Sequence, residues 1–107
     1  MKTNKEKRLF YEEEKDGSNV LVRLHGRLDS ETAGELDTYL NETSESTDSI
    51  TINIADLQYI SSAGLRLFLT LHKKMMSKGG MRLLNPQEHI VEIFEVTGFS
   101  SCFDIEE

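Results

Sequence analysis

Ile50-Thr-Ile-Asn-Ile-Ala-Asp-Leu-Gln-Tyr-Ile-Ser-Ser-Ala-Gly-Leu-Arg-Leu-Phe-Leu-Thr-Leu71 is the stretch that decides the fold. At residues 50–55 isoleucines alternate with smaller or polar residues, which is the period of a β-strand. Residues 56–60 are expected to form a short turn. From there on, apolar side chains recur at helical spacing. The stretch therefore predicts a strand, a turn and a helix that begins at a pair of serines, Ser61 and Ser62.

Two interpretations of the serines follow from their position. A serine at a helix start caps the helix by accepting a hydrogen bond from a free backbone N–H group. A phosphorylated serine would present its phosphate to the same N–H groups and to the positive end of the helix dipole. The residues alone leave Ser62 open as a structural cap or as a phosphorylated switch.

Gly64 is the second unusual feature of this stretch. A glycine in a helix costs roughly 1 kcal/mol relative to alanine. Its presence predicts that the neighbouring strand turn or another protein approaches the helix closely. Together with the small Ala63, it leaves few protruding side chains at the start of the helix. This start follows the carboxyl end of a strand, which is where functional sites usually lie in open α/β sheets.

The rest of the chain alternates strands with helices. Two strands at 9–14 and 20–25 are joined by turn residues 15–19, and the second is apolar on both faces, which predicts an interior position. A helix capped by Asp29 or Ser30 buries Ala33, Leu36, Tyr39 and Leu40 and ends in the polar stretch 41–48.

The second half of the chain continues the alternation. The helix at Ser62 is expected to end near Ser77 or Lys78, followed by a strand at 81–84, a helix at 87–97 with Pro86 as its first residue, and a short edge strand within 99–105. This order predicts an α/β fold with a mixed, mostly parallel sheet, an N-terminal hairpin and right-handed crossovers.

Composition excludes several classes of protein. The 107 residues suit one domain, with residues 1–7 as a flexible tail. No apolar run approaches the length of a membrane span, and a net charge of −7 disfavours direct nucleic-acid binding. The lone Cys102 suits a reducing cytosol and is expected to be a small core residue.

Catalytic and cofactor motifs are scarce. No phosphate-binding glycine loop is present, and His25, His72 and His89 lack the spacing of a metal site, so no cofactor and no metal are expected. A small hydrolase with Ser62 as nucleophile is a third reading, but the G-x-S-x-G pattern fails because Ile60 stands where a glycine is needed.

Several short motifs occur together in one order. Gly26-Arg-Leu-Asp29 follows the second strand, Asp56-Leu57 the third, and Tyr59-Ile-Ser-Ser-Ala-Gly-Leu65 opens the helix, with Gly79-Gly80 and Gly98-Phe99 further on. In this order they resemble a STAS domain of the anti-sigma-factor-antagonist type. The resemblance covers nearly the whole chain.

The resemblance implies a mixed sheet with helices mainly on one side and no enzymatic activity. It implies that Ser62 is phosphorylated by an anti-sigma factor that is a serine kinase of the ATP-binding GHKL type, and that a serine phosphatase removes the phosphate. The unphosphorylated protein would bind the kinase and release its target. These features imply a cytoplasmic phosphoprotein that regulates transcription by partner switching.

The resemblance also implies a partner-binding surface. Asp29 matches an acidic residue of the family and is expected to help dock the kinase or to position nucleotide. Ser61 stands where the family often has Asp, so it is either a recognition residue or an alternative acceptor. The remaining candidates are Ala63, Gly64, Arg66 and Thr70. The alternative from the same fold is a non-switching adaptor of a larger complex such as a transport system, with Ser62 only as a helix cap.

Overall fold

The computed structural model describes residues 8–107, so the tail expected at residues 1–7 lies outside it. The elements are β1 (Leu9–Asp16), β2 (Asn19–Leu28), α1 (Ala33–Glu45), β3 (Ser49–Ile60), α2 (Ser62–Met75), β4 (Met81–Leu84), α3 (Glu88–Thr97), the 3₁₀ helix η1 (Phe99–Ser101) and β5 (Asp104–Glu106). The predicted alternation of strands and helices is confirmed.

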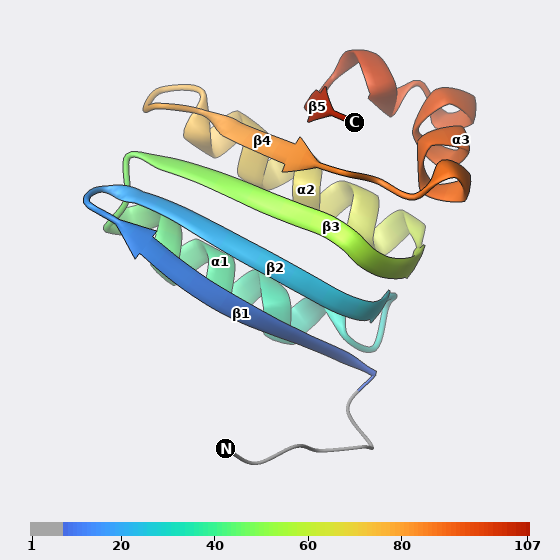
Figure 1. The fold of residues 1–107 in the computed structure, drawn as a ribbon, viewed down its shortest axis with the longest axis horizontal. Helices are drawn as coiled ribbons and strands as arrows, with labels where there is room; N and C mark the ends of the chain where they lie inside the picture. Colours follow the sequence, from blue (N-terminus) through green and yellow to red (C-terminus); the bar gives the residue numbers. More distant parts are fainter. Residues whose placement is uncertain (1–7) are drawn as a thin grey trace.

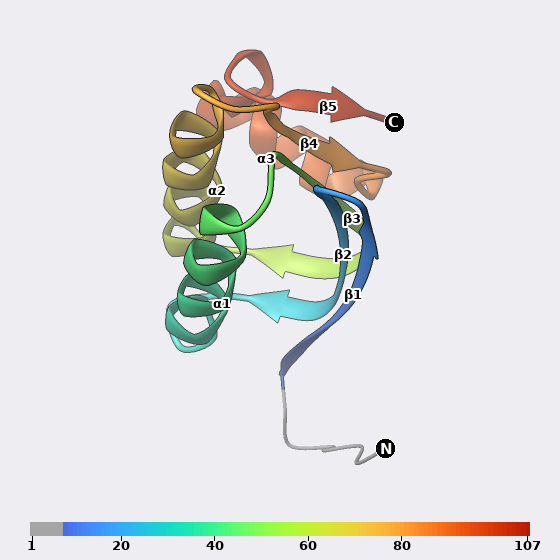
Figure 2. The ribbon, with the colours of Figure 1, turned by 90° about the vertical axis from the view of Figure 1, so that its left-hand side faces the viewer.

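The five strands form one sheet in the order β1-β2-β3-β4-β5. β1 runs antiparallel to β2, and β2 through β5 are parallel to one another. Helices α1 and α2 lie side by side on one face, and α3 lies beyond the end of β4 (Figures 1 and 2). The mixed sheet, the N-terminal hairpin and the interior position of β2 are therefore as predicted.

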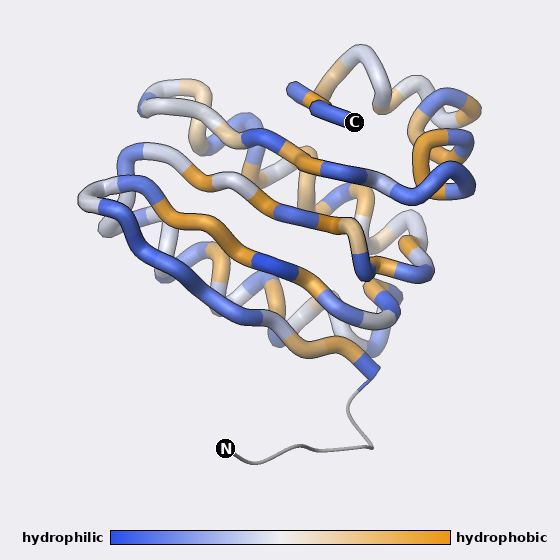
Figure 3. The backbone as a smooth tube through the Cα atoms, viewed as in Figure 1, coloured by the Kyte–Doolittle hydropathy of each residue, from blue (hydrophilic) through white to orange (hydrophobic). Residues whose placement is uncertain are grey.

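The core lies between the sheet and the α1–α2 layer. Alternate residues of the two central strands, including Val22 and Leu24 of β2 and Ile52 and Ile54 of β3, are fully buried. Phe68 of α2 is also fully buried, as its helical spacing predicts. Figure 3 shows apolar residues concentrated in β2 and β3 and a largely hydrophilic β1 at the sheet edge. Alternation along the strands thus assigns one face of the sheet to the core.

β3 is longer than expected, and the turn predicted at residues 56–60 is wrong. The strand continues to Ile60 and stays paired with β2, with register shifts between Arg23 and His25 and between Gly26 and Arg27. With these irregularities, Leu57 and Ile60 are buried, and each is preceded by a pair of exposed residues. The burial period is therefore three rather than two, which is why this part does not read as a strand.

α1 also extends beyond its predicted end. The stretch 41–48, expected as a loop, is helical as far as Glu45. Lys78 donates to the carbonyl oxygens of Ser44 and Thr47, at 2.5 and 2.9 Å, and so satisfies backbone groups at the end of this helix. A polar composition marked this segment as a loop, but a lysine distant in the sequence stabilises its last turn.

Three expectations for smaller features are also wrong. α2 ends at Met75 rather than near Lys78. Pro86 precedes the N-cap of α3, Gln87, and so lies outside the helix. Cys102 is exposed, and the neighbouring Phe103 occupies the core position instead. The strand expected within 99–105 is divided into η1 and β5, and β5 pairs with β4.

Gly64 is buried where α2 crosses the ends of two strands. A Cβ at this position would lie 2.7 Å from Leu28 Cγ and 2.8 Å from Ile60 Cγ1. Leu28 and Ile60 belong to the core, so neither can move away freely. The close approach predicted for Gly64 is thus made by the neighbouring strands.

Gly64→Ala is expected to lower the free energy of unfolding by about 1 kcal/mol. Overpacking costs about 1–3 kcal/mol, and the gain in helix propensity of about 1 kcal/mol offsets only part of it. Gly34→Ala is the matched control, because that glycine also lies in a first helical turn and a Cβ there meets nothing within 4 Å. It should stabilise the protein by up to about 1 kcal/mol. Urea denaturation measures both, and equal effects would contradict this account of Gly64.

Candidate functional site

The ends of β2 and β3 bring Asp29 and the two serines to one edge of the sheet. Leu28 and Ile60, the last residues of these strands, are register partners. The N–H of Ser61 donates to the carbonyl of Leu28 at 2.9 Å, which continues the pairing for one more residue. Asp29 and Ser61 are therefore the first residues after two paired strand ends. Asp29 precedes α1 and Ser61 precedes α2.

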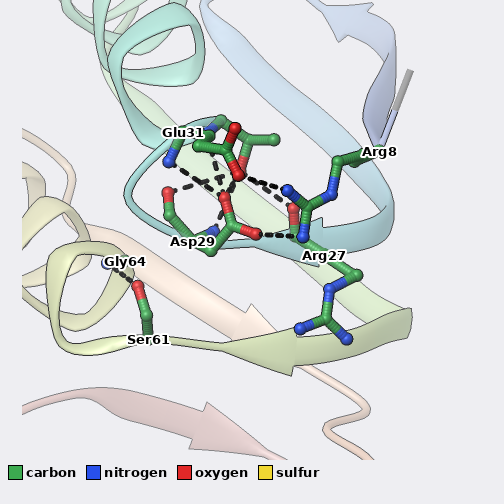
Figure 4. Close-up of polar contacts among 7 residues, drawn as sticks. Arg8, Arg27, Asp29, Glu31, Ser61 and Gly64 are labelled. Carbon is green, nitrogen blue, oxygen red and sulfur yellow. Dashed lines mark hydrogen bonds and ion pairs between the residues drawn. The ribbon is translucent and has the colours of Figure 1, made fainter. Parts of the chain in front are cut away.

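The N-cap of α2 is Ser61, so of the two interpretations of Ser62 the structural cap is wrong. Ser61 has an extended backbone, and its Oγ accepts from the N–H of Gly64 at 3.4 Å (Figure 4). Ser62 is the first residue of the helix. The sequence offers two adjacent serines, and in the structure it is the hydroxyl of Ser61 that faces the Gly64 N–H.

Ser62 is exposed, and within residues 8–107 its hydroxyl makes no hydrogen bond. The N–H groups of Ser62 and Ala63 likewise have no acceptor within this part of the chain. The amides at the start of a helix carry the positive end of its dipole. A negatively charged group on Ser62 would find both free donors and a favourable field there.

Asp29 is engaged inside the protein rather than presented to solvent. Its Oδ1 accepts from the N–H groups of Glu31 and Thr32 at 3.0 and 3.1 Å, and Thr32 Oγ1 accepts from the N–H of Asp29 at 2.9 Å (Figure 4). Arg8 Nη2 contacts the second oxygen at 2.8 Å. These contacts stabilise the turn that precedes α1, but the N-cap of the helix, which begins at Ala33, is Thr32 and not Asp29 or Ser30 as predicted.

These contacts hold the pKa of Asp29 below its usual value. Burial is the largest single influence and raises the pKa, but it is outweighed by hydrogen bonds from the Thr32 and Glu31 N–H groups and by the charge of Arg8. The carboxylate therefore remains ionised with its charge compensated within the fold.

Arg8 is a functional residue that sequence reasoning missed. It also pairs with Glu31 at 2.5 Å, so it joins the strand start of β1 to the turn before α1. Gly26 makes this approach possible, because its φ is +108° and a Cβ there would lie 2.2 Å from the Arg8 carbonyl oxygen. The signal in the sequence was the charged residue directly before Leu9, within a run that resembles a tail.

The candidate residues of α2 form an exposed row beyond Ser62. Arg66 and Thr70 are exposed, and Ala63 is half-buried beside them. Within residues 8–107 Arg66 makes no ion pair. Gly64, by contrast, is buried and packs against the strands. The structure therefore brings Ser62, Ala63, Arg66 and Thr70 to one surface and turns Asp29 and Gly64 inward.

The uncovered face of the sheet carries a separate cluster that the sequence did not predict. His25 lies between Glu12 and Asp56, with its Nε2 at 2.7 Å and its Nδ1 at 3.1 Å from their carboxylate oxygens. Phe10 stacks on the same ring with a centroid distance of 4.6 Å. Nearby in the register, Arg27 lies over the ring of Tyr59 at 4.2 Å.

These contacts leave the hydrolase reading without support from the described residues. His25 is paired with carboxylates, and His89 lies 2.7 Å from the Gln58 carbonyl. No histidine in residues 8–107 contacts the Ser62 hydroxyl, and this part of the chain holds no group of His, Cys, Asp or Glu suited to a metal. Among its helices, none is both long and apolar enough to cross a bilayer.

Comparison with protein-family models gives a match to the STAS domain over residues 11–107. The chain belongs to the STAS domain family. A relative named anti-sigma-B factor antagonist, from Staphylococcus epidermidis, is 31% identical over 80% of this chain and 82% of its own length. The family resemblance seen in the sequence is thereby confirmed.

Solved structures of other STAS proteins share the fold. The crystal structure of an anti-sigma factor antagonist from Mycobacterium paratuberculosis superposes with a TM-score of 0.82 at 17% identity, covering 92% of this chain and 85% of that one. SpoIIAA matches in its unphosphorylated form (TM-score 0.77, 90% and 87% covered) and in its phosphorylated form from Bacillus (TM-score 0.71, 90% of each chain), both at 21% identity.

Ser61→Ala is expected to lower the free energy of unfolding by about 0.5–1 kcal/mol, since it removes a cap whose hydrogen bond is long. Ser62→Ala should change it by less than about 0.5 kcal/mol, because the exposed hydroxyl bonds to nothing in the described chain. Chemical denaturation of the two variants in parallel makes the measurement. A larger loss for Ser62→Ala than for Ser61→Ala would show that the cap is misassigned.

Asp29→Asn should remove stability at neutral pH and make little difference in acid. A depressed carboxyl pKa contributes fully above the ordinary value of about 3.9, and the contribution disappears as pH falls through the lower folded-state pKa. The gap in Tm between wild type and Asp29→Asn should therefore close below about pH 4. Glu42→Gln, which removes an exposed carboxylate from α1, is the control. A gap for Asp29→Asn that is constant with pH would contradict the prediction.

Proposed function

We propose that this STAS protein is an anti-sigma factor antagonist whose binding is switched by phosphorylation of Ser62. The observation that carries the proposal is the exposed hydroxyl of Ser62 at the first position of α2, where neither this hydroxyl nor the N–H groups of Ser62 and Ala63 have a partner among residues 8–107. Capping is performed by Ser61, so modification of Ser62 would leave the helix start intact. The names of its relatives support the same function.

The partner is an anti-sigma factor that is a serine kinase of the GHKL type, and a serine phosphatase restores the hydroxyl. In the unphosphorylated state, the low surface at Ser62 and Ala63 lets the kinase approach the backbone of α2. The kinase then releases its sigma factor. This cycle belongs in the cytoplasm, where ATP and sigma factors are found.

A phosphate on Ser62 would break this contact without refolding the protein. It adds roughly −1.5 to −2 charges and three acceptor oxygens. The amides of the first turn of α2 would hold these oxygens, and the charge and bulk would then occupy the contact surface. The Asp29 carboxylate at the adjacent strand end is already compensated by Arg8, so it contributes little repulsion.

Incubation with ATP and the kinase encoded beside this protein should place one phosphate on Ser62, located by mass spectrometry. Ser62→Ala should abolish the modification, whereas Ser61→Ala should retain it because Ser61 Oγ is turned toward the Gly64 N–H. Phosphate on Ser61 alone would reassign the acceptor. A failure of the cognate kinase to phosphorylate any serine would favour the non-switching adaptor.

Ser62→Glu is expected to weaken binding to the kinase at least tenfold, equivalent to about 1.4 kcal/mol, with little change in Tm. Ser18→Glu adds the same charge at an exposed position in the β1–β2 turn, at the opposite end of the sheet (Figure 1), and should bind like wild type. Titration calorimetry provides the affinities. If both variants bound the kinase equally weakly, the loss of affinity would be due to net charge and not to the position of Ser62.

A further inference from the structure

A shallow groove runs between α1 and α2 on the outer side of the helical layer. It is lined by Ala33, Gly34, Asp37 and Asn41 from α1 and by Ala63, Arg66, Leu67 and Thr70 from α2, with a volume of about 370 Å³. The sequence pointed only to the α2 side of this surface. Its α1 side adds Gly34, Asp37 and Asn41, which lie outside the core, and Ala33, which packs against it.

The floor of the groove is low because its residues are small. Ala33, Gly34 and Ala63 come from the first turns of the two helices, and a Cβ added to Gly34 would meet nothing within 4 Å. Small residues on a helix surface allow a third helix to approach more closely than the usual 8–10 Å between axes of larger side chains. Gly34 is therefore not explained by internal packing, unlike Gly64.

The walls of the groove carry opposite charges that are not paired with each other. Within residues 8–107, Asp37 on α1 accepts only from the Asn41 side chain, at 3.1 Å, and Arg66 on α2 makes no ion pair. A segment that offered a basic group to Asp37 and a carboxylate to Arg66 would be charge-complementary to both walls.

The far end of the groove is fixed by bonds between the helices. Lys74 Nζ donates to Asn41 Oδ1 at 2.7 Å, and Lys78 bonds to carbonyls at the end of α1. The two walls are thus held at a set spacing before any partner arrives. Such preorganisation lowers the entropic cost of binding.

At the start of α2, the groove extends to Ala63, the residue after Ser62. Ala63, Arg66 and Thr70 follow Ser62 by one, four and eight positions on α2, so the wall residues and Ser62 lie along one side of the helix. A chain lying in the groove would contact Ala63, the residue that follows Ser62. This continuity favours the kinase over other occupants, because the kinase must reach Ser62.

We infer that the α1–α2 groove receives a helical segment of the anti-sigma kinase, with small apolar side chains over Ala33 and Gly34, a basic group toward Asp37 and a carboxylate toward Arg66. The inference rests on the proposed function and extends its contact surface from α2 onto α1. Recognition of the antagonist then depends on a glycine that lies outside the family's serine motif.

Gly34→Gln tests the inference, because glutamine favours helix and its side chain would fill the groove without meeting the core. Binding to the purified kinase in the presence of ADP should weaken at least tenfold, while Tm stays equal or rises. Glu42→Gln, on an exposed part of α1 outside the groove, should bind like wild type. Arg66→Glu should weaken binding through repulsion of the kinase carboxylate.

Hydrogen exchange of the wild-type complex gives an independent measurement, and it should show protection of residues 33–41 as well as 61–70. If Gly34→Gln binds as tightly as wild type while Ser62→Glu still binds weakly, the groove is empty in the complex and only the inference fails. If wild type does not bind the kinase at all, the proposed function fails with it. A wild-type dimer that Gly34→Gln dissociates would assign the groove to a second copy instead.

Discussion

The pairing of the last residues of β2 and β3 is the constraint on which the rest of the site depends. Leu28 and Ile60 are register partners, and the Ser61 N–H bonds to the Leu28 carbonyl beyond the end of β3. Both side chains also occupy the space that a Cβ at Gly64 would need. One contact therefore fixes where α2 begins, which serine caps it and which serine is left outside.

The negative charge at the strand end next to Ser62 is compensated within the fold. Asp29 lies at the adjacent strand end, but Arg8 and two backbone N–H groups compensate it and keep its pKa low. An uncompensated carboxylate there would repel an acidic partner before any modification. With this charge neutralised, addition of a phosphate to Ser62 would produce a large relative change in the local potential.

The sequence predicts the elements well where periodicity and local chemistry agree, and less well where distant contacts decide. The alternation at Ile50–Ile54 and the order of elements are confirmed by the sheet. The last part of β3 was missed because its bulged pairing with β2 changes the burial period. The sequence around Ser61 and Ser62 does not show which of them caps α2. The start of this helix depends on its packing against Leu28, which is distant in the sequence.

Gly34 and Gly64 show why a switch at this position need not alter the fold. Each is in the first turn of a helix, but one is required by the core and the other leaves an open floor on the surface. Gly64 allows α2 to pack against the strands whatever is bound to Ser62. Gly34 leaves open a preformed groove that extends to Ala63, the residue after the same serine. A phosphate on Ser62 would then act by occupying the entrance to a rigid surface, and the energy for reorganising the protein would be close to zero.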